Sequence, residues 1–207
     1  MIYALPRYAL ILASMSSTRK KMLTDAGLAF TAEAAPVDEE ALRQAGEAEG
    51  ISGIDMATAL AEAKAARVSQ RHPEAFVIGA DQILECEGRW FGKPETLEAA
   101  QDTLSALAGK THHLITAAVI LQGGRRLWQH CERPAVSIRN LDNRARDSYL
   151  SLIGTTAMET PGCYQIEGPG AQILAGIDGC PYAVLGLPLL QLLAFLREHG
   201  LEPRGQA

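Results

Sequence analysis

The stretch ALILASMSSTRKK at residues 9–21 brings together the two patterns that decide the fold. Residues 9–13 form a short apolar run ending in a small residue, which is typical of a buried strand in a covered sheet. The polar segment after it leads into a helical pattern over residues 19–26. A strand that opens into a helix N-terminus presents free N–H groups to an anion, and Ser14 and Arg19 could complete that surface. An ordinary N-capping turn would use the same residue types.

Strand and helix patterns alternate through the rest of the chain. Apolar runs predict strands at residues 75–79, 114–121, 135–139 and 172–177. Helical spacing predicts helices at residues 56–70, at 97–107 behind a Thr96 cap, and at 188–199 starting from Pro188. Glycines predict turns at 123–124 and 168–170, and residues 44–53 resemble a loose segment. This alternation favours a mixed α/β sheet flanked by helices.

Composition favours a single globular domain over residues 1–207, with 47% hydrophobic and 21% charged residues. The apolar stretch 184–196 is too short to span a membrane, and the N-terminus resembles a first strand rather than a signal peptide. The four scattered cysteines indicate reduced thiols of a cytoplasmic protein. A net charge of −5 argues against nucleic-acid binding, so an anionic ligand would need a few placed cations.

Acidic side chains at two places could do chemistry. Asp81 and Gln82 follow the apolar run 75–79, and ligands of open α/β sheets collect beyond the carboxyl ends of strands. An acid there could hold a divalent ion or accept a proton from water, although an acid in a turn after a strand is also common. Glu39 lies in the acidic cluster 37–40, which a solvated loop would equally explain.

Two lysines and two histidines complete the candidates. Lys64 lies among alanines on the predicted helix 56–70, where it could point into a cleft or extend to solvent. Lys93 lies in a rigid turn between Gly92 and Pro94. His112 and His113 are expected in a loop, and no carboxylate or cysteine stands at a spacing that would orient them, so we assign them no role.

Seven short motifs occur in an order that resembles the Maf family of nucleotide pyrophosphatases from end to end. They are Leu12-Ala13-Ser14-x-Ser16-x-x-Arg19, Val37-Asp38-Glu39, Lys64-Ala65, Gly79-Ala80-Asp81, Gly92-Lys93-Pro94, Gly162-x-Tyr164-x-Ile166-x-Gly168 and Gly186-Leu187-Pro188-Leu189. The resemblance implies a fold like that of the Maf and inosine triphosphate pyrophosphatases, with two lobes around a cleft and commonly a homodimer. It implies cleavage of a nucleoside triphosphate to the monophosphate and pyrophosphate.

The same resemblance assigns roles to residues. Asp81 matches the proton acceptor that activates water, and Glu39, Lys64 and Lys93 match other catalytic positions. Ser14 and Arg19 match substrate-binding positions. The implied cofactor is Mg²⁺ or Mn²⁺, for which the carboxylates of Glu39 and Asp81 are suitable ligands. Placed cations would stabilise the charge that develops as a phosphoanhydride breaks.

Three positions vary with substrate class in this family, and Thr18, Gln82 and Glu167 occupy them here. Gln82 and Glu167 resemble the subgroup that hydrolyses 7-methyl-GTP, whereas Thr18, and Ser17 where proline is usual, depart from the family pattern. The alternatives are a dTTP/UTP pyrophosphatase and a non-catalytic nucleotide-binding regulator of cell division.

Overall fold

The computed structural model describes residues 2–5 and 7–204, and these form two compact units. Unit 1 is built from residues within 1–82, 116–132 and 182–207, and unit 2 from residues 83–115 and 133–181. Two long strands, β4 (Phe76–Cys86) and β6 (Thr111–Gln122), contribute residues to both units.

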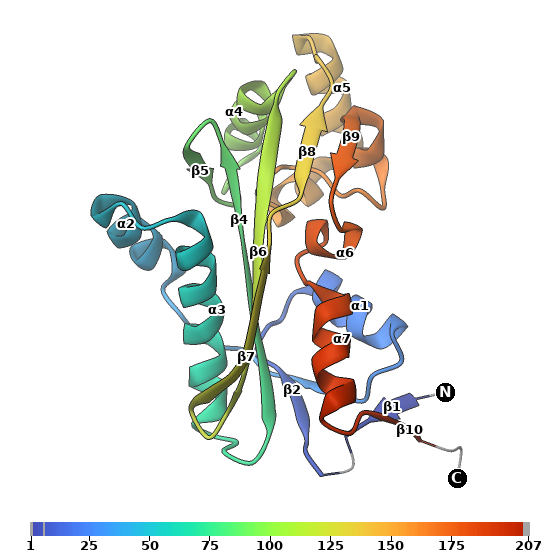
Figure 1. The fold of residues 1–207 in the computed structure, drawn as a ribbon. Helices are drawn as coiled ribbons and strands as arrows, with labels where there is room; N and C mark the ends of the chain where they lie inside the picture. Colours follow the sequence, from blue (N-terminus) through green and yellow to red (C-terminus); the bar gives the residue numbers. More distant parts are fainter. Residues whose placement is uncertain (1, 6, 205–207) are drawn as a thin grey trace. The chain divides into compact units, whose positions relative to one another are not determined.

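Unit 1 contains the parallel part of the main sheet. Strand β2 (Leu10–Leu12) lies between β3 (Thr31–Ala32) and β4 and is parallel to both, β6 is the next strand, and β7 (Arg125–Glu132) pairs antiparallel with β6. The helices are α1 (Ser17–Asp25), α2 (Glu39–Glu49), α3 (Gly53–Ser69), α7 (Leu189–Glu198) and, apart from its first residue, the short α6 (Pro181–Val184). Strands β1 (Ile2–Ala4) and β10 (Glu202–Arg204) form a separate antiparallel pair. Figure 1 shows α3 on one side of the main-sheet strands of unit 1 and α7 on the other.

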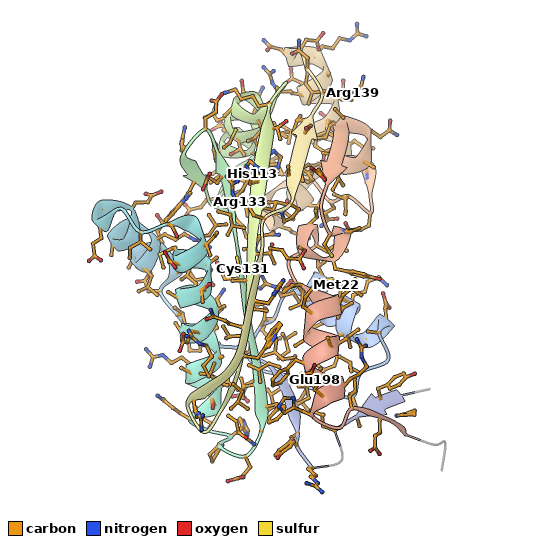
Figure 2. All side chains as sticks on the ribbon, viewed as in Figure 1. Met22, His113, Cys131, Arg133, Arg139 and Glu198 are labelled. Atoms are coloured by element: carbon orange, nitrogen blue, oxygen red, sulfur yellow. The ribbon has the colours of Figure 1, made fainter. Side chains whose placement is uncertain are left out.

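The core of unit 1 holds the N-terminal strand and helix in place. Leu12 on β2, Ile78 on β4 and Leu192 on α7 are fully buried in one hydrophobic cluster. Met22 on α1, labelled in Figure 2, belongs to the same cluster. Full burial of such a side chain stabilises a fold by about 1.5–3 kcal/mol. The loop between β2 and α1 is therefore anchored at both ends.

Unit 2 contains the antiparallel part of the sheet. Strand β5 (Arg89–Phe91) pairs with β4, and β8 (Ala135–Ile138) pairs with β6 and β9 (Leu174–Asp178), all antiparallel. Helices α4 (Leu97–Leu107) and α5 (Asn143–Ile153) pack together with the 3₁₀ helix η1 (Gly154–Glu159), and η2 (Pro169–Ile173) leads into β9. The side chain of Thr96 accepts a 3.1 Å hydrogen bond from the N–H of Ala99, which confirms the predicted helix start.

The predicted mixed α/β architecture is confirmed, but three local predictions are wrong. Asp81 and Gln82 lie inside β4, not in a turn after it. His112 and His113 lie inside β6, not in a loop before it. Residues 44–49, expected to be loose, form the second half of α2.

One physical reason explains the two strand errors. The polar side chains of Asp81, Gln82 and His112 all bond to partners inside the protein, so they do not end their strands. A buried polar group is tolerated in a strand when its hydrogen bonds are satisfied. In the described part of the chain all four cysteines are free, and Cys131 and Cys180 are only half-buried. Among the helices of the described residues, none has both the length and the hydropathy that a membrane span needs.

Candidate active site

Asp81 occupies the middle of β4, where its side chain is only 4% exposed. The neighbouring Gly79 allows helix α3 to approach this strand closely. A Cβ atom at Gly79 would lie 2.0 Å from the carbonyl oxygen of Ala61 on α3, which no packed structure accommodates. This close approach brings Lys64, one turn further along α3, to Asp81.

Lys64 links two carboxylates. Its Nζ lies 2.6 Å from Oδ1 of Asp81 and 2.8 Å from Oε1 of Glu39. Glu39 is the first residue of α2, and the side chain of Asp38 caps that helix by accepting a 3.0 Å hydrogen bond from the N–H of Ala41. The Coulomb attraction between such charges is stronger in a buried site than on the surface, and Lys64 is only 7% exposed. The predicted Glu39, Lys64 and Asp81 therefore belong to one cluster.

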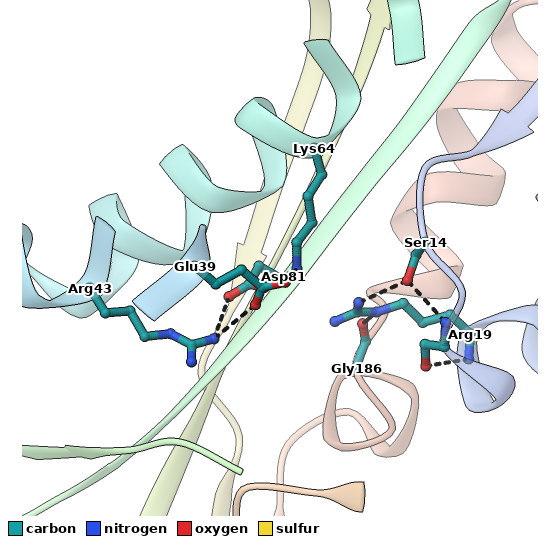
Figure 3. Close-up of polar contacts among 8 residues, drawn as sticks. Ser14, Arg19, Glu39, Arg43, Lys64, Asp81 and Gly186 are labelled. Carbon is teal, nitrogen blue, oxygen red and sulfur yellow. Dashed lines mark hydrogen bonds and ion pairs between the residues drawn. The ribbon is translucent and has the colours of Figure 1, made fainter. Parts of the chain in front are cut away.

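Arg43 is a member of this cluster that the sequence analysis missed. It lies one turn after Glu39 on α2, and its Nη2 is 3.3 Å from Oε2 of Glu39 and 3.6 Å from Oδ2 of Asp81 (Figure 3). The four-residue spacing from Glu39 is a recognisable signal, but only once residues 39–49 are known to be helical. We call Glu39, Arg43, Lys64 and Asp81 the acid–base cluster. It balances two carboxylates with two cations.

One oxygen of Asp81 has no hydrogen bond with any residue that the structure describes. Oδ2 is buried, and among the described residues no donor bonds to it, although Arg43 lies nearby. A buried carboxylate oxygen left without a donor costs free energy, so this atom is suited to bind a water molecule or a cation. No group of three or more His, Cys, Asp or Glu side chains that could hold a metal was found in the described part of the chain. Glu39 and Asp81 suit Mg²⁺, because this ion is commonly held by one or two carboxylates together with water and substrate oxygens.

A second cluster lies at the start of α1. The Nε of Arg19 donates a 2.7 Å hydrogen bond to the carbonyl oxygen of Gly186, and its Nη1 donates a 3.4 Å bond to Oγ of Ser14. Ser16 caps the helix through the N–H of Arg19. Figure 3 shows the guanidinium group of Arg19 pointing toward the acid–base cluster. Ser14, Arg19 and the first turn of α1 thus lie together, and we call them the anion-binding surface after the role predicted from the sequence, which stays a prediction.

The two clusters influence each other electrostatically. Burial lowers the pKa of Arg19, and the negative charges of Asp81 and Glu39 partly oppose that shift. Burial raises the pKa of Glu39, but Lys64, Arg43 and Arg19 outweigh it, so the pKa of Glu39 lies below its ordinary value. Glu39 is therefore ionised at neutral pH, and Arg19 remains a cation because a guanidinium does not deprotonate in proteins.

The remaining predicted residues lie elsewhere or have other partners. Thr18 is in the first turn of α1. The Nε2 of Gln82 donates to Oγ1 of Thr116 and to the carbonyl oxygens of Ala183 and Val184. Lys93 and Glu167 are exposed residues of unit 2, so the structure does not group them with the clusters of unit 1, and their roles stay predictions.

The fold and these clusters define an α/β protein in which a helix N-terminus and a half-buried arginine–serine contact accompany a buried carboxylate. Residues 9–199 match the family described as Maf-like protein, so the chain belongs to the Maf family, as the seven motifs predicted.

Three relatives match almost the whole chain. A nucleoside triphosphate pyrophosphatase of Granulibacter bethesdensis is 46% identical over 190 residues, covering 92% of this chain and 96% of the relative. A protein of the same name from Paramagnetospirillum magneticum is also 46% identical, covering 92% of this chain and 98% of the relative. A 7-methyl-GTP pyrophosphatase of Mesorhizobium japonicum is 45% identical over 191 residues, covering 92% and 96%.

Proposed function

We propose that this chain is an enzyme that hydrolyses nucleoside triphosphates to the monophosphate and pyrophosphate. The observation that carries the proposal is the buried Asp81, whose Oδ1 is fixed by Lys64 while Oδ2 has no hydrogen-bond donor among the described residues. The names of the relatives, which include nucleoside triphosphate pyrophosphatase at 45–46% identity, support the same reaction.

The anion-binding surface would hold the polyphosphate. Free N–H groups at the start of α1 and the guanidinium of Arg19 offer donors to phosphate oxygens, and Ser14 orients Arg19. Lys64 is placed beside Asp81, where a cation can offset negative charge developing on the reacting phosphate. Because the overall charge of the chain is −5, these local cations rather than a general positive field must attract the substrate.

Asp81 would accept the proton in the chemical step. A water molecule hydrogen-bonded to Oδ2 attacks a phosphorus atom next to the oxygen that bridges the α- and β-phosphates. The bond from water oxygen to phosphorus forms, the bond from that phosphorus to the bridging oxygen breaks, and the water proton passes to Asp81. Lys64 fixes Oδ1 at 2.6 Å, so the orientation of the carboxylate is set before the substrate binds.

A divalent cation is part of the proposal. Glu39 and Asp81 would hold Mg²⁺ or Mn²⁺ together with phosphate oxygens, and the metal would supply charge neutralisation on the polyphosphate. Arg43 contacts the same two carboxylates and would have to give up part of these contacts when the metal binds. The homodimer implied by the family resemblance and the cytoplasmic location inferred from the four scattered cysteines stay predictions.

For the substrate we propose 7-methyl-GTP or another modified nucleotide. The relatives with 42–45% identity that are named 7-methyl-GTP pyrophosphatase support this choice. Glu167 is the residue that could pair with the N–H edge of guanine and favour a cationic methylated ring, because a carboxylate accepts strong hydrogen bonds from such donors. A dTTP/UTP pyrophosphatase is the alternative.

A nucleotide panel tests the proposal. Pyrophosphate release would be measured with 7-methyl-GTP, GTP, dTTP, UTP and CTP in the presence of Mg²⁺. We expect kcat/KM to be highest for 7-methyl-GTP. Highest turnover of dTTP and UTP would establish the alternative substrate class, and equal turnover of all five would refute a preference. Nucleotide binding with no pyrophosphate release from any of them would indicate a regulator.

A further inference from the structure

A pair of polar side chains on neighbouring strands holds the segment that follows α6. Thr116 on β6 is fully buried, and its Oγ1 donates a 2.8 Å hydrogen bond to the carbonyl oxygen of Ala183. Gln82 on β4 donates from Nε2 to Oγ1 of Thr116 at 2.8 Å, to the same Ala183 oxygen at 2.9 Å and to the Val184 oxygen at 3.1 Å. All these atoms belong to unit 1. We call Gln82 and Thr116 the polar clamp.

The carbonyl oxygen of Ala183, which the polar clamp binds, is also hydrogen-bonded to Gly186. The N–H of Gly186 donates a 3.0 Å hydrogen bond to the oxygen of Ala183, which closes a tight turn. Gly186 has a φ of +97°, a conformation that residues with a side chain rarely adopt. A Cβ atom there would lie 3.6 Å from both Nε and Nη2 of Arg19. The position of the Gly186 carbonyl therefore depends on the same oxygen that the polar clamp holds.

Gly186 in turn orients Arg19. Its carbonyl oxygen accepts the 2.7 Å hydrogen bond from Nε, the shortest contact of this guanidinium group. A guanidinium is planar, so one fixed Nε–H bond sets the plane in which the other N–H groups point. Displacement of the Ala183–Gly186 turn would rotate the donors that face a phosphate. The residue Arg19 is half-buried, which limits the freedom of its side chain to find another partner.

We propose that Thr116 and Gln82 are positioning residues for Arg19, acting through the carbonyl of Ala183 and the backbone of Gly186. The inference rests on the proposed function, because it assigns Arg19 to the polyphosphate. It also gives Gln82 a role other than reading the base: its amide nitrogen is already bound by two carbonyls and a hydroxyl. Loss of the polar clamp should thus weaken turnover of every nucleotide by the same factor.

The test begins with Thr116→Val, which keeps the shape of the side chain and removes the hydroxyl. We expect kcat/KM to fall roughly tenfold, by equal factors for 7-methyl-GTP, GTP, dTTP and UTP, because loss of orientation alone costs catalysis of this order or more. Thr116→Ser restores the hydroxyl and should recover most of that loss. Thr111→Val is the matched control: it lies on the same strand, removes a 2.7 Å hydroxyl contact with Ser137, and should leave kcat/KM unchanged.

A double-mutant cycle separates positioning from a general effect on packing. In an Arg19→Gln background, Thr116→Val should cost less than about threefold, since residues that act through one another are not additive. Full additivity would overturn the proposal. Loss factors that differ among the four bases would also overturn it, because they would indicate contact with the base.

A direct readout does not depend on catalysis. In ¹⁵N NMR spectra of the full chain, the Nε–H signal of Arg19, assigned with Arg19→Lys, should shift or broaden in Thr116→Val and return in Thr116→Ser. An unchanged signal would refute the positioning role. If the wild-type chain hydrolysed no nucleotide, the proposed function would fail, while this measurement would still decide whether the polar clamp holds Arg19.

Discussion

At the scale of single residues, the acid–base cluster combines side chains that are unremarkable alone. Glu39 lies in an acidic cluster of the sequence and Lys64 in an alanine-rich helix, and each pattern by itself also fits a solvated surface. Their significance comes from Asp81, which lies within 2.6 Å of the ammonium group that also contacts Glu39 at 2.8 Å. Removal of one partner would leave a buried charge unpaired, which is strongly unfavourable.

Arg43→Gln tests whether this arginine competes with a divalent cation. Arg43 is 3.3 Å and 3.6 Å from oxygens of Glu39 and Asp81. Without its charge, the nucleotide-free protein should bind Mn²⁺ on the order of tenfold more tightly, which corresponds to about 1.4 kcal/mol and is well within the attraction of charges at this distance. Mn²⁺ binding would be measured by electron paramagnetic resonance. Arg67→Gln, an exposed residue of α3 with the same change in charge, should have little effect. Unchanged or weaker binding in Arg43→Gln would contradict this role.

Arg43 also illustrates what sequence reasoning could not reach. An arginine in a segment of glutamates and alanines carries no signal of its own, because a solvated helix face has the same composition. Only the α2 helix, its cap at Asp38 and its approach to α3 place the guanidinium beside Asp81. The motif residues Ser14, Glu39, Lys64 and Asp81 were found because several motifs agreed in order, not because any one of them was distinctive.

His112 gives a prediction about pH. Burial, with a smaller contribution from His113, lowers the pKa of His112 from 6.5 to about 4, and its Nε2 lies 2.6 Å from the hydroxyl of Tyr164. The unfolded chain therefore binds a proton below pH 6.5 that the folded protein does not accept until about pH 4. The free energy of unfolding should therefore decrease as the pH is lowered from 6.5 to about 4, and His112 should account for up to about 3 kcal/mol of this decrease.

Urea unfolding at several pH values checks this expectation. The variant His112→Gln keeps a hydrogen-bonding group near Tyr164. We expect its free energy of unfolding to be lower than that of the wild type at neutral pH. Between pH 6.5 and 4, its free energy of unfolding should change less steeply with pH than that of the wild type. The remaining slope comes from carboxylates such as Glu39, whose lowered pKa also makes stability fall with acid. Equal slopes in both proteins would show that His112 is not the titrating group.

At the scale of elements, the distance between α3 and β4 decides whether the acid–base cluster can form. Gly79→Ala would place a Cβ atom 2.0 Å from the backbone oxygen of Ala61, so the helix and strand would have to separate. We expect a loss of roughly 2–4 kcal/mol in stability, in the range of strongly disruptive core substitutions. Turnover should fall as well, because the Lys64–Asp81 contact spans the same two elements.

Thermal unfolding and pyrophosphate release would be measured together for this variant. Gly176→Ala on β9 is a suitable control, because a Cβ there would meet nothing within 4 Å and the residue has no unusual φ. A Gly79→Ala protein with wild-type stability and turnover would contradict the close packing of α3 on β4.

The sequence predicted a helix or strand correctly where local apolar periodicity or a local capping residue indicated it. It did not predict the extent of a strand where contacts with residues distant in the sequence determine it. Helices α3, α4 and α7 and strand β2 lie close to their predicted positions, because their apolar spacing and capping residues are local signals. Strand β4 was predicted to end near Gly79, yet it continues to Cys86. The polar pair Asp81-Gln82 would normally indicate a turn, and only its partners Lys64 and Thr116, distant in sequence, keep it in the sheet.

At the scale of the whole molecule, charge distribution matters more than net charge. The net charge of the chain is −5. The cations of the anion-binding surface and of the acid–base cluster, which are Arg19, Arg43 and Lys64, nevertheless all belong to unit 1. Local cations at a helix N-terminus are sufficient to bind a phosphate group, and an acidic remainder reduces unwanted association with nucleic acid. Both features agree with a small anionic substrate.

Asp81→Asn tests most directly whether Asp81 accepts the proton from the attacking water. Nucleotide binding would be measured by calorimetry and turnover by pyrophosphate release, with Asp102→Asn on the exposed face of α4 as control. We expect binding within about threefold of wild type and kcat lower by about a thousandfold, the scale of general-base catalysis. Turnover by Asp81→Asn at a rate close to that of the wild type would contradict the account.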